Sequence, residues 1–194
     1  MTNNNTPFII RETSSGEAVH TIQDEMFLRR EVEYVGEVDA ESAASICRQL
    51  LQLYREDPEK EITMYINSPG GEVLSGLAVI DVMKAISCPV RTVCMGRAYS
   101  MGADIFASGD KRDILPHGEV MIHDPGLSGV SGSTGSIQET SRRMLKLRDV
   151  TNGLLAEHTG KSLKEINKKT AKDCYFSAQE AVEFGLADRV IDRL

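Results

Sequence analysis

Two glycine-bearing segments, residues 67–71 and 96–102, are the first candidates for chemistry. Each follows a predicted strand and precedes a predicted helix. At such a junction the first amides of the helix have no partner within it, and the helix dipole adds positive potential, so an anion or a developing oxyanion is stabilised. Neither segment fits the phosphate-loop motif or the glycine motif of dinucleotide-binding folds. We therefore expect an oxyanion hole rather than a nucleotide site.

Ser100 lies in the second of these segments, where a hydroxyl at a helix start can act as a nucleophile. The alternative is that Ser100 only caps the helix, which is the commoner role of serine at this position. A nucleophilic hydroxyl needs a base, and the sequence offers four histidines. Structural roles account for His20, His117 and His158. His123 ends an apolar strand that runs into a glycine-rich loop, a place where active-site residues are commonly found.

The base in turn needs a carboxylate that fixes its tautomer. Asp124 is adjacent to His123, but neighbouring residues of a strand point to opposite faces, so Asp124 is badly placed. Asp173 lies in a predicted loop far along the chain and is free to approach. The residues alone leave the choice among the acids open.

The elements that must position these groups alternate between strand and helix, which predicts one α/β domain. Period-two or continuous apolar patterns indicate strands, and apolar residues spaced three or four apart indicate helices. Asp39 is a plausible N-cap for the first of these helices. The predicted strands are residues 32–38, 62–66 and 90–95, and the predicted helices are residues 39–57, 73–86 and one from residue 103.

The second half of the chain begins with two short predicted strands, residues 112–115 and 120–123, joined by a segment with the composition of a tight hairpin. A stretch of Gly, Ser and Thr follows, and residues 136–158 then form a long polar helix closed by Gly160. Its sparse apolar positions suggest that this helix projects and packs partly against another subunit; they include Ile137, Met144, Leu147 and Leu154. Ser162 and Ser177 have capping-box spacing and are expected to open two shorter helices.

The bulk composition excludes several classes of function. With 194 residues and a net charge of -7, the chain has no broad attraction for nucleic acid or anionic lipid. No apolar run is long enough to cross a bilayer, and residues 1–6 lack the order of a secretory signal, so we expect a cytoplasmic protein. The cysteines are expected to be reduced thiols without a metal; they are Cys47, Cys88, Cys94 and Cys174.

The chain closely resembles the proteolytic subunits of Clp proteases from Phe8 to Ile191, and five blocks of sequence, met in the same order, carry the resemblance most specifically. The blocks are YINSPGG at 65–71, CMG at 94–96 with SMG at 100–102, MIH at 121–123, HTG at 158–160, and Asp173 followed by Ser177-Ala178. The resemblance implies an α/β fold of the ClpP/crotonase-like kind, a spiral of β-β-α units with a projecting long helix, or handle. It implies a single domain over residues 1–194, with an N-terminal axial segment at 1–22 and the glycine-rich strand and handle helix at 124–160.

Carried over residue by residue, the resemblance assigns a role to each candidate. It makes Ser100 the nucleophile, His123 the base and Asp173 its partner, with the backbone amides of Gly71 and Met101 as oxyanion donors. The extended backbone after Gly70 and the segment from Gly126 would bind the substrate as added strands. No metal or cofactor is implied, because ATP is used by a partner and not by this chain.

The implied assembly is two stacked heptameric rings of this chain, served by an unfoldase of the AAA+ class that delivers unfolded polypeptides. Four positions differ from the pattern of similar proteins: Tyr99 replaces a small residue, Asp124 a Gln, Lys172 an Arg, and Gln23 a tyrosine of the docking surface. Two alternatives remain open at this stage. One is a weakly active or structural subunit of mixed rings, and the other is a crotonase-like acyl-CoA enzyme that would not need Ser100.

Overall fold

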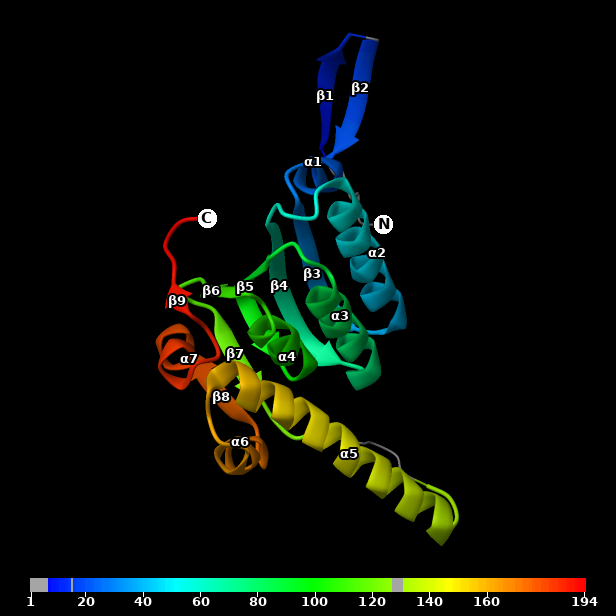
Figure 1. The fold of residues 1–194 in the computed structure, drawn as a ribbon, viewed down its shortest axis with the longest axis vertical. Coiled ribbons are helices and arrows are strands. Elements are labelled where there is room, and N and C mark those ends of the chain that lie inside the picture. Colours follow the sequence, from blue (N-terminus) through cyan, green and yellow to red (C-terminus); the bar gives the residue numbers. More distant parts are fainter. Residues whose placement is uncertain (1–6, 15, 127–130) are drawn as a thin grey trace.

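A computed structural model describes residues 7–14, 16–126 and 131–194. Two segments named in the predictions lie outside these described residues. They are the polar segment 1–6, which lacks the order of a secretory signal, and residues 127–130 of the predicted glycine-rich strand. The ribbon in Figure 1 shows three parts: a sheet covered by helices, a narrow strand pair projecting at one end, and a long helix extending from the other.

The centre of the fold is a parallel sheet whose first three strands are each followed by a helix. The strands are β3 (Glu31–Val38), β4 (Ile62–Gly71) and β5 (Val90–Tyr99), and the helices are α2 (Ala40–Glu56), α3 (Val73–Ala85) and α4 (Met101–Ala107). Figure 1 shows α2, α3 and α4 along one face of the sheet. Asp39 caps α2 with a reciprocal capping box, as predicted, and the helix buries a stripe at the expected spacing, namely Ala43, Ile46, Leu50 and Leu53.

Strands β4 and β5 run further than the sequence predicts, so the expected turns at 67–71 and 96–102 are wrong in extent. Gly71 is still paired with Val38, and the last residues of β5 pair with the next strand in the sheet. Cross-strand pairing therefore keeps these glycine-bearing segments extended, with a register shift between Ile66 and Ser68. Only Ser100 turns the chain from β5 into α4.

The predicted hairpin at 116–118 is also wrong. The flanking strands are β6 (Lys111–Ile114) and β7 (Glu119–Ile122), and both pair in parallel with β5: β6 along Arg91–Cys94 and β7 along Arg97–Tyr99. A hairpin requires antiparallel neighbours. The short link instead carries the chain from one half of the β5 edge to the other, with the Gly118 N–H donating to the Leu115 carbonyl at 2.8 Å.

The C-terminal elements contain the predicted long helix and two strands that were not predicted. They are α5 (Thr134–Thr159), α6 (Leu163–Thr170), β8 (Cys174–Ser177), α7 (Ala178–Phe184) and β9 (Arg189–Val190). Helix α5 ends at Gly160 with φ 70°, and Figure 1 shows its N-terminal half extending away from the sheet. Ser177 forms the predicted capping box, whereas Ser162 caps α6 by accepting from the Glu165 amide. The unpredicted β8 pairs antiparallel with β7.

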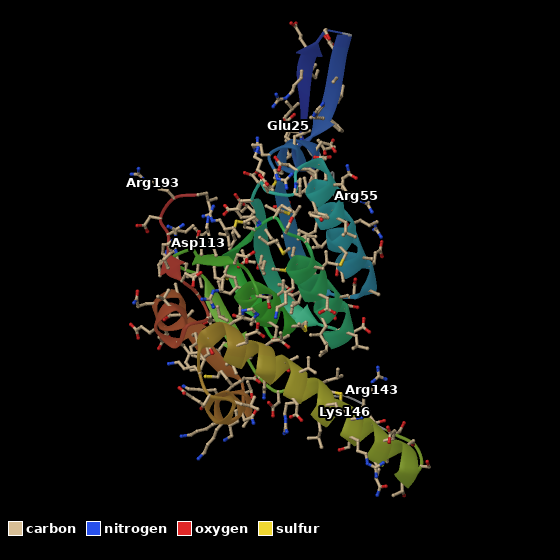
Figure 2. All side chains as sticks on the ribbon, viewed as in Figure 1. Glu25, Arg55, Asp113, Arg143, Lys146 and Arg193 are labelled. Carbon is tan, nitrogen blue, oxygen red and sulfur yellow. The ribbon has the colours of Figure 1, made fainter. Side chains whose placement is uncertain are left out.

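The N-terminal end is an antiparallel pair, β1 (Phe8–Thr13) and β2 (Gly16–Thr21), followed by the short helix α1 (Ile22–Leu28). Glu25 of α1, labelled in Figure 2, is only 3% exposed and anchors the pair. The guanidinium of Arg11 donates to its carboxylate, with Nε at 2.8 Å, and His20 Nδ1 lies 3.0 Å from Oε1. These contacts fix the strand pair relative to α1.

Candidate active site

The predicted site residues gather at one edge of the sheet, where the parallel strands end. Gly71 closes β4, Ser100 follows β5, and His123 follows β7. Asp173 immediately precedes β8, and because β8 runs antiparallel to β7 with Cys174 opposite Ile122, its start lies at the same edge. The carboxyl ends of parallel strands are where ligand sites form in α/β sheets. Four segments that are distant in sequence are thus brought to one place.

Ser100 adopts a backbone conformation that serine rarely takes, with φ 53° and ψ -126°. Such strain costs about 1–3 kcal/mol and persists only where the surroundings determine it. The Ser100 amide donates to the Met121 carbonyl at 2.8 Å, and its own carbonyl accepts from Ala103 at 2.8 Å. Its side chain makes no capping hydrogen bond to α4. The simple N-cap interpretation therefore does not describe this hydroxyl.

The Ser100 hydroxyl instead meets the imidazole of His123, with Oγ 2.8 Å from Nε2. On the other side of the ring, Nδ1 lies 3.1 Å from Asp173 Oδ1. The carboxylate can only accept, so Nδ1 carries the proton in this arrangement and Nε2 is left to accept from the hydroxyl. His123 is 30% exposed and Asp173 57% exposed, so both are reachable from solvent. The geometry is that of a hydroxyl, a base and an orienting acid.

Asp124 has a different set of partners, as its strand position predicts. Its carboxylate accepts from Asn152 Nδ2 on α5 at 3.2 Å, and its amide donates to the Thr170 carbonyl at 2.7 Å. Asn152 is fully buried and also donates to Thr170 Oγ1 at 3.1 Å. This buried amide ties the segment after His123 to α5 and α6. Sequence reasoning missed it, because nothing in the pattern of α5 distinguishes Asn152 from a solvent-facing polar residue.

The two glycine-bearing segments meet at Ser100. A Cβ atom on Gly70 would lie 2.5 Å from the Tyr99 carbonyl oxygen, 2.7 Å from Ser100 Cβ and 3.0 Å from the Met101 amide nitrogen. Only glycine permits so close an approach, and its φ of 88° is also one that glycine adopts easily. The end of β4, with Gly71 next in the chain, is therefore pressed against the start of α4, whose first amides lack helical partners.

A cavity of about 320 Å³ adjoins this edge and includes two of the predicted residues, Gly71 and Gly126. Gly70 is not part of its wall. The start of α3 and the projecting helix α5 supply the rest: Glu72, Val73, Leu74, Thr140, Arg143, Met144 and Leu147. Figure 2 labels Arg143 on α5. The helical pattern predicts that Met144 and Leu147 pack against another subunit, whereas in the structure they line a cavity of their own chain.

Across residues 7–14, 16–126 and 131–194, no group of three or more His, Cys, Asp and Glu side chains is arranged to hold a metal ion. The four cysteines are free thiols. Within the same described ranges, none of the helices combines the length and the apolar character needed to cross a lipid bilayer.

A comparison with protein families gives one match. A family model described as Clp protease matches residues 14–194, which is nearly the whole chain. The architecture agrees with it: the described residues form a mixed α/β fold with seven helices and a mostly parallel sheet, the ClpP/crotonase-like arrangement with a projecting long helix that the sequence predicts.

Proposed function

Because the chain belongs to the Clp protease family, we propose that it is a serine endopeptidase that hydrolyses peptide bonds of unfolded proteins inside a closed oligomeric chamber. Family membership supports a peptidase of the serine type. The observation that carries the finer proposal is the hydrogen-bonded series from Ser100 through His123 to Asp173. A hydroxyl, an imidazole and a carboxylate in this order are the parts that nucleophilic acyl transfer requires.

In the proposed mechanism, His123 removes the proton of Ser100 as the hydroxyl oxygen attacks the peptide carbonyl. Asp173 holds the imidazole in the correct tautomer and stabilises the imidazolium that forms. The backbone amides of Gly71 and Met101 donate to the oxyanion of the tetrahedral intermediate. His123 then gives its proton to the leaving amine, and a water molecule, activated by the same imidazole, releases the acyl group. No cofactor enters any step.

The substrate is proposed to bind as an extended strand, with its backbone paired to the segments at Gly70 and Gly126. The neighbouring cavity then receives one side chain. Its walls combine apolar groups from Met144 and Leu147 with the polar ends of Glu72 and Arg143. Main-chain pairing provides affinity without reading sequence, so we expect broad specificity.

We further propose that residues 1–194 act as one domain that assembles into two stacked heptameric rings in the cytoplasm and receives substrates from an AAA+ unfoldase, which uses the ATP. Large exposed apolar side chains support contacts beyond this chain. On α5 these are Ile137, Leu145 and Val150, which suit the handle segment 124–160 for ring contact. On the axial segment 1–22 they include Phe8, Ile10 and Val19. A second cavity, of about 430 Å³ and lined partly by Gln23, Met26 and Phe27, offers a docking surface.

The direct test is labelling by a fluorophosphonate, which reacts with an activated serine, together with peptide hydrolysis. We expect the purified chain to be labelled at Ser100, and Ser100→Ala to lose labelling and about 10⁶-fold in turnover if the three groups act as a unit. Ser87→Ala is the matched control, because its hydroxyl only donates to the Pro58 carbonyl at 2.8 Å. An unchanged rate in Ser100→Ala would reject the proposed site. A native mass of roughly fourteen chains would support the rings, and a stable monomer would not.

One observation favours a second candidate, a structural or weakly active subunit of mixed rings. Tyr99, a bulky residue, directly precedes Ser100. If its bulk displaced the serine, the chain would complete a ring while contributing little hydrolysis. Absence of fluorophosphonate label on Ser100 in assembled particles, both with and without a paralogous subunit, would select this alternative.

A further inference from the structure

Tyr99, the last residue of β5, makes a set of contacts that the proposed mechanism leaves unexplained. Its hydroxyl donates a hydrogen bond to the Glu119 carboxylate on β7. Its ring packs edge to face with the ring of Tyr175 on β8, with centroids 5.8 Å apart and planes at 90°. The guanidinium carbon of Arg97 lies 5.8 Å from the centre of the same ring. One side chain thus contacts β7, which pairs with β5, and β8, which pairs with the far side of β7.

These two strands carry the other members of the proposed catalytic group. Glu119 begins β7, the strand that ends immediately before His123. Tyr175 belongs to β8, which begins immediately after Asp173. Tyr99 itself directly precedes the serine. The hydrogen bond of Tyr99 therefore connects it to the strand that precedes His123, and its ring contact connects it to the strand that follows Asp173.

We propose that Tyr99 is a positioning residue, which ties the end of β5 to the start of β7 and to the start of β8 so that the Ser100 hydroxyl stays within hydrogen-bond distance of His123. The inference rests on the proposed peptidase function and assigns Tyr99 no contact with substrate. It also explains how a bulky residue is compatible with an active serine at the next position.

The backbone pairing at this edge is short, which is why a side-chain link matters. Strand β7 pairs with β5 only along Arg97–Tyr99, and β8 has four residues. Ser100 must in addition be held in its strained conformation. An aromatic pair and a hydrogen bond to a carboxylate add to this pairing and favour one arrangement of β5, β7 and β8.

The Tyr99 hydroxyl is suited to act as a permanent donor. Its hydrogen bond to the Glu119 carboxylate, together with partial burial, raises the pKa of Tyr99 to about 12. The hydroxyl therefore stays protonated throughout the pH range in which a neutral imidazole can act as a base. If Tyr99 served only to fill space, its ring would be sufficient and the hydrogen bond from its hydroxyl to Glu119 would not be needed.

The test removes the donor and keeps the ring. In Tyr99→Phe we expect kcat for a peptide to fall about tenfold with KM unchanged, because a small displacement of the reacting groups slows the chemical step without altering substrate contacts. The rate of fluorophosphonate labelling should fall by the same factor. Tyr34→Phe is the matched control, since it deletes a hydroxyl that is bonded to Ser42 at 3.3 Å on another part of the sheet. It should leave kcat unchanged.

The acceptor gives an independent test that does not depend on Tyr99→Phe folding normally. Glu119→Ala should reproduce the loss in kcat, whereas Glu119→Gln keeps an amide oxygen as acceptor and should restore most of the rate. The double variant Tyr99→Phe/Glu119→Ala should be no slower than either single variant, because both remove the same bond.

The outcomes separate this inference from the function on which it rests. If the wild type is labelled and hydrolyses peptides, but Tyr99→Phe and Glu119→Ala do so at the same rates, the positioning role is wrong and the peptidase stands. A rise in KM with unchanged kcat would also overturn it, because that indicates contact with substrate. If the wild type is neither labelled nor active, the peptidase proposal fails. The positioning role of Tyr99 then fails too, because it rests on that function.

Discussion

Replacing Gly70 by alanine tests the close approach of the end of β4 to Ser100. The added Cβ would lie 2.5 Å from the Tyr99 carbonyl oxygen and 2.7 Å from Ser100 Cβ. Both atoms belong to the backbone or to the first side-chain carbon, so neither can move aside by rotating. The end of β4 must separate from the serine, and the amide that follows Gly70 moves with it.

The size of the effect follows from these distances. Non-bonded carbon atoms pack at about 3.5–4.0 Å, so the clash demands a shift of about 1 Å. A displacement of this size in a catalytic constellation costs about 10²-fold in rate. An alanine at the Gly70 φ of 88° adds strain of about 1–3 kcal/mol to the folded state. We therefore expect kcat/KM to fall about 100-fold, together with a moderate loss of stability.

Alanine substitutions at two other glycines distinguish the effect of the steric clash at Gly70 from the effect of its backbone strain. Gly36 has a φ of 99° but open space around its Cβ position, so Gly36→Ala introduces strain alone. Gly153 lies within α5, has no neighbour within 4 Å of the Cβ position and no positive φ, so Gly153→Ala introduces neither. Gly153→Ala should stabilise the helix by up to about 1 kcal/mol. Both controls should keep wild-type kcat/KM, measured with a short peptide, while urea unfolding reports stability.

The comparison between Gly70→Ala and Gly36→Ala shows whether the close approach of Gly70 to Ser100 affects kcat/KM. If Gly70→Ala loses stability but retains kcat/KM within about threefold of Gly36→Ala, the close approach to Ser100 has no role in rate, and the reasoning from the 2.5 Å contact is refuted. A loss of rate in Gly70→Ala alone supports it.

Three carboxylates give further predictions. Asp173→Asn should lower kcat by at least about 10²-fold at constant KM in the peptide assay, because His123 loses the acceptor that fixes its tautomer. Burial raises the pKa of Asp113, but hydrogen bonds from Arg189 and Arg91 outweigh this and hold it below its usual value. Its contribution to stability is therefore fully present above pH of about 4 and is lost as the pH falls through the lowered pKa. Asp113→Ala should cost about 2–3 kcal/mol in urea unfolding at pH 7 and progressively less as the pH falls below about 4. Asp104 has the opposite sign, because burial raises its pKa well above the usual value. Above pH of about 4 the unfolded chain ionises at this residue while the folded carboxyl stays protonated, so the free energy of unfolding falls as the pH rises. Asp104→Asn should gain stability over the wild type as the pH rises from 5 to 8, and a constant difference would contradict this.

The elements that the sequence predicts well are those whose signals are local. Helix α2 has an acidic N-cap at Asp39 and a buried stripe at helical spacing, and both are properties of one short segment. Helix α5 is likewise closed by Gly160 in the left-handed conformation that its position predicts. Such features need no knowledge of the rest of the chain. A contrasting case is Asp113, labelled in Figure 2, which is buried and forms ion pairs with Arg91 and Arg189, two arginines that lie far apart in sequence.

The errors concern pairing between distant segments. Whether 116–118 forms a hairpin depends on whether β6 and β7 pair with each other or with β5, and composition does not decide this. The same limit applies to Asp173. Its approach to His123 depends on β8 pairing with β7, and a four-residue strand has too little pattern to be predicted. The residues alone therefore left the acid open, and only the family resemblance named it.

Ser100 shows why such a site is hard to derive from local preferences. A serine at this position of the chain is expected to cap α4, yet the folded chain holds it at φ 53° with its hydroxyl turned to His123. That conformation is unfavourable for the segment by itself, so the neighbours must impose it: the Met121 carbonyl accepts the Ser100 amide, and Gly70 is pressed against its Cβ. Each of these neighbours comes from a different strand. The conformation of the serine is therefore a property of the assembled strand ends, and any substitution that separates them should reduce the rate before it unfolds the chain.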